Sequence, residues 1–350
     1  MDNSSQRTIL RVSPACEIPQ LAGEITAALV GNGPTLGFGE ISSNSAPQKA
    51  AVVVGTTGTS GSSKEVVLSA TALISSARAS NKYLGAKPGE TWSLLLPLTH
   101  IAAVNVIVRS IELGTLPVDL RNYEGEYPKV DYTSIVPTQL FKALNGDDRL
   151  LNHLKAARVV LVGGAALSAS LRNQAELSGI KVVTTYGMTE TCGGCVYDGE
   201  VLDGVEVDIR NGSIFIRGSV LASSLTLVDG WFESNDLGEI VDGKLVVIGR
   251  ADDVIITGGE NLSLNAVEAS LNTAFPDIQC AAFAIDDKQW GQSLQIAIVG
   301  SINAEQVTTH LEKDLGVFAK PKGIHHLASL PLLGIGKVDR KSLAEEFGHE

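Results

Sequence analysis

A ten-residue run rich in glycine and hydroxyl side chains follows an apolar stretch in the first quarter of the chain. The run reads GTTGTSGSSK and ends at Lys64. Glycines let the backbone approach a ligand closely, hydroxyl groups donate hydrogen bonds, and lysine supplies positive charge. We expect strand, loop and then a helix near Ser69, which would direct N–H groups at an anion. Taken alone, the run fits a phosphate cradle or an ordinary flexible loop, because it matches neither the Walker A nor the GxGxxG pattern.

A second chemical pattern is the Cys-x-x-Cys formed by Cys192 and Cys195. A redox site of this kind should open a helix in a small βαβ unit, and this pair does not. A zinc site needs a second pair of ligands, and His310, His325 and His326 do not have suitable spacing. We interpret the two cysteines as small residues packed near a ligand, with redox or metal chemistry as the less favoured alternative.

Composition narrows the class of protein. A length of 350 residues allows two domains, and the net charge of -12 argues against a nucleic-acid surface. The N-terminal stretch MDNSSQRTIL lacks the apolar core of a signal peptide, and the best apolar candidate for a membrane span is interrupted by Arg109 and Glu112. We expect a cytoplasmic protein without membrane insertion. The sequence leaves open whether the chain forms a homodimer.

Up to about Tyr186, short apolar runs alternate with helical patterns. Buried strands are expected within residues 50–54, 92–98, 114–120, 157–164 and 181–187. Helices are expected within residues 69–85, 102–114 and 168–180. This alternation predicts an α/β fold with mainly parallel strands and covering helices.

The rhythm changes after Val196. Residues 205–218, 225–232 and 238–249 read as short strands bracketed by Asn-Gly or Asp-Gly, which predicts a β-rich appendix. The rest reads as a small α+β unit, with helices at 265–274, at 304–316 and from Lys341, and strands at 280–285 and 294–300. We expect one domain over residues 1–249, a boundary at 250–253 and a second domain over 254–350.

Four later stretches, together with the opening loop, resemble the ordered motifs of the adenylate-forming superfamily, which includes acyl-CoA synthetases and luciferases. They are YGMTET (186–191), GWFESNDLGEI (230–240), GRADDVIITGGENLSLNAVE (249–268) and GIGKVDRKSL (334–343). The resemblance implies a ligase that converts a small carboxylic acid into an acyl-adenylate and then into a coenzyme A thioester. It implies ATP, Mg²⁺ and coenzyme A as cofactor and co-substrates.

The resemblance also implies roles for individual residues. Thr189 would donate to the α-phosphate, and Glu190 would be a ligand of Mg²⁺. Asp236 would accept hydrogen bonds from the ribose, which Arg250 would also reach. The other cofactor-binding candidates lie in the loop, at the strand end LVGGAA, in YGMTET and in the segment for the pantetheine arm: Thr56, Thr57, Gly58, Thr59, Ser60, Gly61, Lys64, Gly163, Gly164, Ala165, Tyr186, Gly187, Gly258 and Gly259.

Two further implied roles concern the C-terminal part of the chain. Lys337 would be the catalytic cation, because it would contact both the attacking carboxylate and the α-phosphate as two anions meet. An ordinary surface lysine before a helix is the alternative. Asp252 falls at the hinge position of the superfamily, so residues 254–350 are expected to rotate after adenylation.

The chain departs from the superfamily pattern at three positions. Ser63 replaces the usual Pro of the loop, Glu65 replaces its usual Gly, and Asn235 stands where Gly is usual. We expect the charge of Glu65 to lie near the triphosphate. Two like charges at 4 Å repel by about 1 kcal/mol in water and by more when desolvated.

Within the superfamily, residues 97–110, 132–140, 185–199 and 334–340 look like the o-succinylbenzoate–CoA ligases of menaquinone synthesis. That resemblance implies adenylation of the succinyl carboxylate, with the benzoate carboxylate bound elsewhere. The second carboxylate needs a donor or a cation, and the candidates are His100, Arg109, Ser134 and Thr138.

Three alternatives remain at this point. The ligase could act on a different aryl or acyl acid. The chain could be a degenerate module that holds an adenylate without turnover, given Glu65 and Asn235. An amino-acid-activating domain would need an acidic anchor for the substrate amine, and no residue clearly plays that part.

Overall fold

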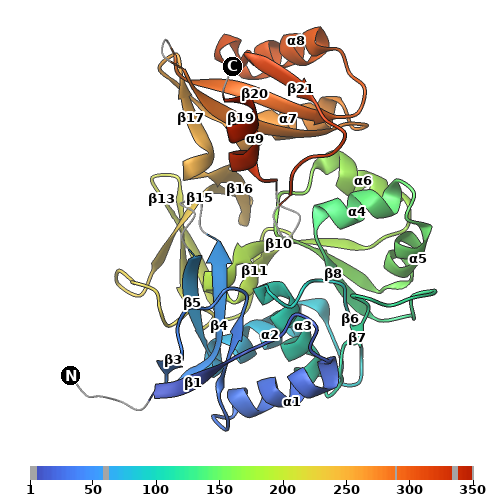
Figure 1. Cartoon of the computed structure of the whole chain (residues 1–350), viewed down its shortest axis with the longest axis vertical. Coiled ribbons are helices and arrows are strands. Elements are labelled where there is room, and N and C mark those ends of the chain that lie inside the picture. The colour runs from blue at the N-terminus through green and yellow to red at the C-terminus, as the bar shows by residue number, and fades with distance from the viewer. Residues whose placement is uncertain (1–5, 58–62, 288–289, 333–337, 349–350) are drawn as a thin grey trace.

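The computed structural model describes residues 6–57, 63–287, 290–332 and 338–348. In these ranges the chain forms four β-sheets with helices packed on and between them (Figure 1). Residues after about 254 form a lobe at one end of the molecule, and the earlier residues form the larger part (Figure 1).

The first sheet carries the hydroxyl-rich run. Its strand order is β3-β1-β2-β4-β5, with β1, β2 and β4 parallel to one another and the two outer strands antiparallel to their neighbours. The strands are β1 (Gln6–Arg11), β2 (Thr35–Phe38), β3 (Ser45–Pro47), β4 (Ala50–Thr57) and β5 (Ser63–Ser69).

The second sheet has the order β12-β11-β10-β9-β8-β6-β7, in which the strands from β7 to β10 are parallel. Its strands are β6 (Trp92–Leu94), β7 (Val118–Asp119), β8 (Tyr132–Ile135), β9 (Val159–Val162), β10 (Val182–Met188), β11 (Gly193–Tyr197) and β12 (Glu200–Val201). Strands β8 and β9 are buried along their whole length, as expected for parallel strands covered on both faces.

The third sheet is an antiparallel meander of β13 (Val205–Arg210), β14 (Ser213–Gly218), β15 (Phe232–Val241) and β16 (Lys244–Arg250). The fourth sheet belongs to the C-terminal lobe and has the order β18-β17-β20-β19, with β21 paired to β20. Its strands are β17 (Val254–Thr257), β18 (Glu260–Ser263), β19 (Gln279–Asp287), β20 (Gly291–Val299) and β21 (Gly323–His326).

The described helices bury one apolar face each. They are α1 (Ile18–Leu29), α2 (Ala70–Leu84), α3 (Ile101–Glu112), α4 (Pro137–Leu144), α5 (Asp148–Ala156), α6 (Ala169–Leu177), α7 (Leu264–Ala274), α8 (Ala304–Leu315) and α9 (Arg340–Phe347), with short 3₁₀ turns η1 (Thr189–Thr191), η2 (Ala251–Asp253) and η3 (Val317–Ala319). None of these helices combines the length and the apolar composition that crossing a bilayer requires.

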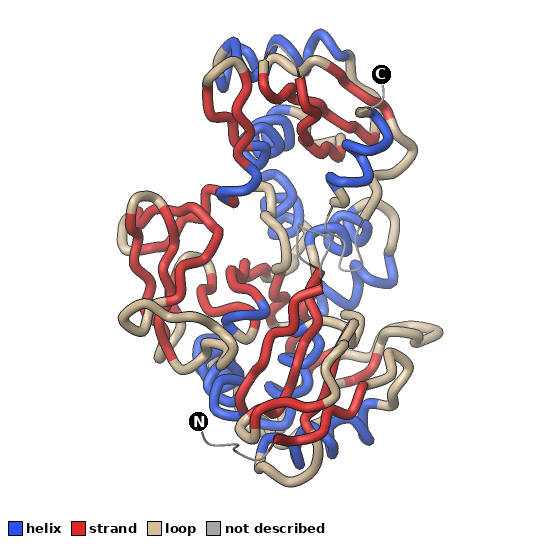
Figure 2. Tube along the Cα trace, turned by 60° about the vertical axis from the view of Figure 1, so that its left-hand side comes forward, coloured by secondary structure: helices blue, strands red, loops and turns tan. Residues whose placement is uncertain are grey.

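The hydrophobic interior is divided between the two ends of the molecule. The largest buried cluster runs from Ile18 to Leu245, whereas a separate cluster of the C-terminal lobe runs from Ile255 to Ala319. Figure 2 shows strands β17 to β21 and their helices as a separate group at the top of the molecule.

The α/β alternation predicted from the sequence is confirmed, and so are the helices expected within residues 69–85, 102–114 and 168–180. Two local expectations are wrong. The hydroxyl-rich run leads into strand β5 and not directly into a helix, so it joins the two strands of a β-hairpin. Residues 225–231 contain one turn, closed by a bridge between Val228 and Trp231, and the strand begins only at Phe232.

Strand β4 is crossed by an earlier segment of the chain just before the hydroxyl-rich run. A β-carbon at Gly55 would lie 2.1 Å from the carbonyl oxygen of Glu40, which no side chain tolerates. Only glycine therefore lets residues 39–43 pass so close to the strand.

Replacing Gly55 with alanine is expected to lower the free energy of unfolding by about 1–3 kcal/mol, because the backbone must shift to remove the overlap. Gly23→Ala is the matched control: Gly23 lies inside α1, and a β-carbon there meets nothing within 4 Å. The control should be more stable than the wild type by about 0.5–1 kcal/mol. Urea denaturation measures both, and equal stability of the Gly55→Ala variant would contradict the close crossing.

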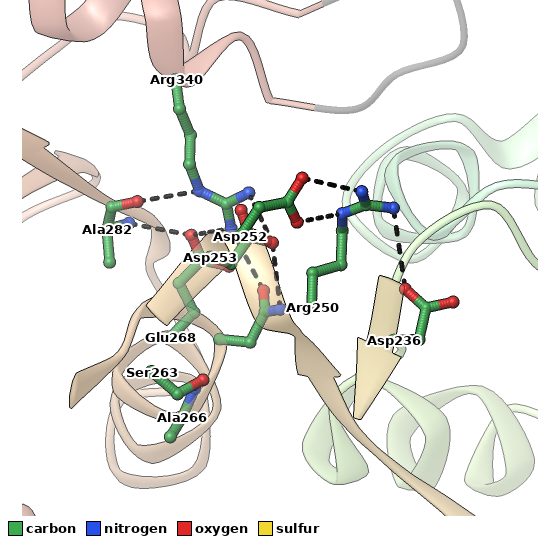
Figure 3. A network of polar contacts seen from close by, with 10 residues as sticks. Asp236, Arg250, Asp252, Asp253, Ser263, Ala266, Glu268, Ala282 and Arg340 are labelled. Carbon is green, nitrogen blue, oxygen red and sulfur yellow. Dashed lines mark hydrogen bonds and ion pairs between the residues drawn. The ribbon is translucent and has the colours of Figure 1, made fainter. Parts of the chain in front are cut away.

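Helix α9 is held in the C-terminal lobe by the side chain of Arg340 (Figure 3). Its Nε donates to the carbonyl oxygen of Ala282 at 2.9 Å, and its Nη2 lies 2.9 Å from Oε1 of Glu268 on α7. The same carboxylate oxygen accepts from the backbone N–H of Ala282 at 2.8 Å. Burial raises the pKa of Glu268 even though Arg340 pulls it down, so the cation offsets part of the cost of a buried charge.

Arg340→Ala is expected to lower the free energy of unfolding by about 3 kcal/mol near neutral pH, because Glu268 is left without its cation. The pKa of Glu268 then rises further, so this carboxylate binds a proton more tightly in the folded state than in the unfolded state. The deficit should shrink as the pH falls toward about 5. Arg217→Ala, which removes an exposed ion pair with Glu206, should change little at either pH. A deficit that grows on acidification would contradict this account.

Candidate functional site

The carboxyl ends of three neighbouring parallel strands form one edge of the second sheet. Ser134 lies near the end of β8, residues 163–165 follow β9, and Tyr186 and Gly187 lie in β10. These strands are in register side by side, so the residues share one edge. In open α/β sheets this edge is where ligands bind.

Strand β10 ends in the tight turn η1, which presents Thr189 and Glu190. Thr191 holds this turn from inside: its buried hydroxyl accepts from the N–H of Met188 at 2.9 Å and donates to the carbonyl of Gly193 at 2.7 Å. Thr189 and Glu190 in this turn are half-buried, whereas Thr191 is fully buried.

Lys64 and Glu190 come together although 126 residues separate them in the sequence. The Nζ atom of Lys64 lies 3.3 Å from Oε1 of Glu190, with 60% of the lysine side chain and 17% of the glutamate side chain exposed. Lys64 pairs with Thr56 in the β4–β5 hairpin, and the Thr56 hydroxyl donates to the Lys64 carbonyl at 3.1 Å. The hairpin therefore places a cation and a hydroxyl beside the turn η1.

A short segment that the sequence analysis did not single out fixes this hairpin to η1. The N–H of Ala222 donates to the carbonyl of Glu190 at 2.8 Å, and the N–H of Ser223 donates to the carbonyl of Val67 at 2.9 Å. The hydroxyl of Ser224 accepts from the N–H of Val67 at 3.1 Å. The partners lie more than 30 residues apart in sequence, so no local pattern indicates them.

Asp236 lies where the second and third sheets meet. The phenol of Tyr186 donates to its Oδ2 at 2.8 Å, and Arg250, its direct partner in the β15–β16 ladder, lies 3.6 Å from its Oδ1. Only 9% of Asp236 is exposed. Burial and the nearby carboxylate both raise the pKa of Tyr186, so the phenol stays neutral and acts as a donor.

Arg250 also binds Asp252, at the point where the chain enters the C-terminal lobe (Figure 3). Its Nε and Nη2 contact the two carboxylate oxygens at 2.7 and 2.8 Å. This two-pronged contact lowers the pKa of Asp252, chiefly through its hydrogen bond from Arg250. One guanidinium thus connects Asp236 with the segment between the lobes.

Gly258 and Gly259 form the turn between β17 and β18 in the C-terminal lobe, both with positive φ. The ring of Trp290 lies so close to Gly258 that a β-carbon there would be 2.7 Å from it, and Lys322 places its Nζ 5.2 Å from the ring centroid. The sequence analysis missed Trp290, although a large aromatic residue in the polar stretch DDKQWGQ was an available signal.

The four candidates for a second carboxylate occupy different surroundings. Arg109 on α3 is 4% exposed and donates to the phenol of Tyr197 at 3.0 Å, while its Nε is buried without a hydrogen-bond partner. Within the described ranges it forms no ion pair. The hydroxyl of Ser134 is also buried without a partner. His100 immediately precedes α3, and Thr138 is in the first turn of α4.

The cysteine pair is part of the packing behind η1. Cys192 and Cys195 are buried, and burial raises the pKa of both thiols, which disfavours the thiolate that redox or zinc chemistry needs. The Cys192 carbonyl accepts from Ser76 at 3.0 Å and from Asn105 at 2.6 Å. Asn105 is a residue that the sequence analysis missed, although a lone amide in the apolar helix AAVNVIV was a usable signal.

The structure tests only part of the predicted site. Five of the predicted residues lie outside the described ranges: Gly58, Thr59, Ser60, Gly61 and Lys337. Of the described ones, Lys64 with Glu190 and Tyr186 with Asp236 and Arg250 are brought into direct contact. No three histidine, cysteine or acidic side chains gather into a metal-binding group in the described part of the chain.

Comparison with known proteins agrees with this arrangement. A family model described as AMP-binding enzyme matches residues 24–247. A probable 2-succinylbenzoate–CoA ligase of Mycobacterium tuberculosis is 39% identical over 329 residues, which span 86% of this chain and 85% of the relative. The 2-succinylbenzoate–CoA ligase of Lactococcus lactis is 28% identical, with coverage of 85% and 71%.

A solved structure shows the same fold. The o-succinylbenzoate CoA synthetase of Bacillus subtilis, in complex with its acyl-adenylate intermediate, superposes with a TM-score of 0.72 at 26% identity and covers 84% of this chain and 69% of its own. The family match spans well over half of the sequence, and it includes the strands that carry Lys64, Tyr186 and Asp236 and the turn η1 that carries Glu190. This chain belongs to the AMP-binding enzyme family.

Proposed function

We propose that this chain is an ATP-dependent acid–CoA ligase that converts o-succinylbenzoate into o-succinylbenzoyl-CoA through an acyl-adenylate. The observation that carries the proposal is the Asp236 carboxylate, which contacts Tyr186 and Arg250 beside the carboxyl edge of the second sheet. The names of the relatives, which are 2-succinylbenzoate–CoA ligases, support the choice of acid.

The nucleotide would lie along the carboxyl edge of the second sheet. Asp236 is an acceptor-only group whose orientation is set by Tyr186, which suits it to the two hydroxyls of a ribose. Residues 163–165 at the end of β9 would flank the adenine. Thr189 and the hydroxyl-rich run that follows β4 would then meet the phosphates.

Glu190 fits the binding of Mg²⁺. Magnesium in nucleotide sites takes one or two protein carboxylates and completes its shell with phosphate oxygens and water. A single half-buried carboxylate, in place of a cluster of acidic groups, is what the described residues provide. The ion would neutralise triphosphate charge, and Lys64 lies close enough to share the same phosphates.

The reaction proceeds in two balanced steps. A carboxylate oxygen of the acid attacks the α-phosphorus, the bond to the leaving pyrophosphate breaks, and Lys337 would neutralise the two anions as they meet. The coenzyme A thiol then loses its proton and attacks the acyl carbon, and AMP leaves.

The two steps require two placements of the C-terminal domain. We propose residues 1–249 as the first domain, residues 250–253 as the hinge and residues 254–350 as the moving domain. The Arg250–Asp252 contact lies at that hinge. Gly258 and Gly259, packed beside Trp290, would line the path of the pantetheine arm.

Arg109 is the permanently charged residue among the four candidates for the second carboxylate, and its guanidinium lies 5.1 Å from the ring centroid of Trp92, the first residue of β6. It is a buried cation with an unsatisfied Nε, and Ser134 adds an unsatisfied buried hydroxyl. A buried charge without a carboxylate partner is costly, and an anionic substrate group would offset that cost.

Lys337→Ala tests the catalytic assignment. We expect adenylation to slow by about 10³-fold, the loss typical of a removed transition-state contact. Transfer of a supplied acyl-adenylate to coenzyme A should stay near the wild-type rate, because that step does not use the lysine. Pyrophosphate–ATP exchange and thioester formation measure the two halves. An equal loss in both, in a folded variant, would contradict the two-placement mechanism.

Arg109→Met tests the choice of acid. We expect KM for o-succinylbenzoate to rise by about 10- to 100-fold, as for a lost hydrogen bond to a charged group. The KM of the analogue without the benzoate carboxylate should stay constant, as should KM for ATP. Arg78→Met, which removes an exposed ion pair on α2, is the control. If Arg109→Met raises KM equally for both acids, the arginine has a packing role and does not bind the second carboxylate. If no aryl acid drives pyrophosphate–ATP exchange in the wild type, the proposed function is wrong.

A further inference from the structure

The side chain of Glu65 does not face the side of the hairpin on which Lys64 meets Glu190. Successive side chains of a strand point to opposite faces, so Glu65 lies on the other side of β5 from its neighbour. There its Oε1 accepts from the N–H of Ser42 at 2.6 Å, from the hydroxyl of Ser42 at 2.7 Å and from the N–H of Ser43 at 3.0 Å. The sequence analysis expected this charge near the triphosphate, whereas the carboxylate is bound to Ser42 and Ser43 on the side of β5 opposite to Lys64.

The same turn is held from its other side by Arg11 of β1. The Nε of Arg11 donates to the carbonyl of Ile41 at 3.1 Å, and its Nη2 donates to the carbonyl of Ser43 at 3.1 Å and to Oδ1 of Asn44 at 2.9 Å. Residues 41–44, called the 41–44 turn below, thus give N–H groups to a carboxylate and carbonyl groups to a guanidinium.

The 41–44 turn lies against the base of the hydroxyl-rich hairpin. Glu65 is directly opposite Gly55 in the β4–β5 register, and Gly55 is the residue over which the carbonyl of Glu40 passes. Both strands are therefore fixed next to the Thr56–Lys64 pair, because Gly55 precedes Thr56 and Glu65 follows Lys64. A shift of the hairpin would have to break the contacts of Glu65 or displace the crossing at Gly55.

We propose that Glu65 is a positioning residue of the nucleotide site, which fixes the hairpin on the 41–44 turn so that Lys64 is held toward Glu190 and the phosphates of ATP. The inference rests on the proposed function, because it names what the Lys64–Glu190 pair receives. The glycine usual at this position in the superfamily cannot make such a contact.

The charge of Glu65 strengthens this attachment. Partial burial alone would raise its pKa, but the hydrogen bonds from Ser43 and Ser42 outweigh burial and lower the pKa to about 2. The carboxylate therefore stays ionised throughout the range in which enzymes work. Hydrogen bonds to an ionised acceptor are shorter and stronger than those to a neutral one.

A graded pair of variants tests the inference. Glu65→Ala removes all three contacts and is expected to raise KM for ATP by about tenfold. Glu65→Gln keeps an uncharged oxygen acceptor and should raise it by only about threefold. The KM values for the acid and for coenzyme A should stay within about twofold of the wild type, because neither substrate depends on the hairpin.

Arg11→Ala approaches the same turn from the opposite side and should also raise KM for ATP selectively, although Arg11 is not part of the hairpin. Glu206→Ala, which removes an exposed glutamate paired with Arg217 on the third sheet, is the matched control and should leave all KM values unchanged. An equal rise in KM for all three substrates would overturn the positioning role. An unchanged KM for ATP in Glu65→Ala would overturn it too.

Calorimetric titration with ATP and Mg²⁺, without any acid, separates this inference from the proposed function. If the wild type binds ATP but no acid drives pyrophosphate–ATP exchange, the proposed function is wrong. The ratio of the ATP affinities of the wild type and the variants then still decides the role of Glu65. If Glu65→Ala does not fold, as judged by circular dichroism, Glu65→Gln and Arg11→Ala decide it. A wild type that does not bind ATP would overturn both.

Discussion

The carboxylate of Asp236 connects the parts of the site more than any other group does. One of its oxygens accepts from Tyr186 on the parallel sheet, and the other faces Arg250 on the neighbouring strand of the antiparallel meander. Through Arg250 the connection continues to Asp252, where the chain leaves for the C-terminal lobe. A nearly buried carboxylate is stable only with such partners, so its charge determines how the sheets and the connecting segment meet.

In this arrangement the strands provide a rigid frame, and the turns carry functional side chains. Buried parallel strands end at a common edge, and the chemistry-bearing residues follow those ends on short turns. The turns are not left to their own conformational preferences. Thr191 holds η1 from inside, and residues 222–224 hold both η1 and β5 from outside. Accuracy in placing Glu190 therefore comes from hydrogen bonds across elements that lie far apart in sequence.

Much of the fold could be predicted because it depends on local patterns. Continuous apolar runs predicted β4 and β9, and Ser69 and Gly85 marked the ends of α2, where Ser69 accepts from Ala72 and Gly85 adopts positive φ. Strand β5 was missed because its pairing with β4 is a tertiary property, and the residues before α2 carried no turn signal that required a strand. Residues 225–231 were misread because Asp-Gly fits a turn with or without long flanking strands.

The site could be predicted as a set of residues but not as a geometry. The motifs indicated Lys64, Glu190, Tyr186 and Asp236, yet nothing in the sequence near Glu65 reveals that its partners are Ser42 and Ser43. The charge of Glu65 is bound by Ser42 and Ser43, on the side of β5 opposite to Lys64. Likewise, the hydrogen-bond acceptor of the buried Arg109 is the phenol of Tyr197, which is 88 positions away.

The attachment of residues 222–224 to β5 has a consequence beyond the site. Strand β5 is the last strand of its sheet, and an outer strand with free N–H and carbonyl groups invites pairing with another molecule. Ser223 and Ser224 satisfy the N–H and the carbonyl of Val67. This cover occupies the outer edge of β5 at Val67 and so disfavours the addition of a strand from another molecule at that position.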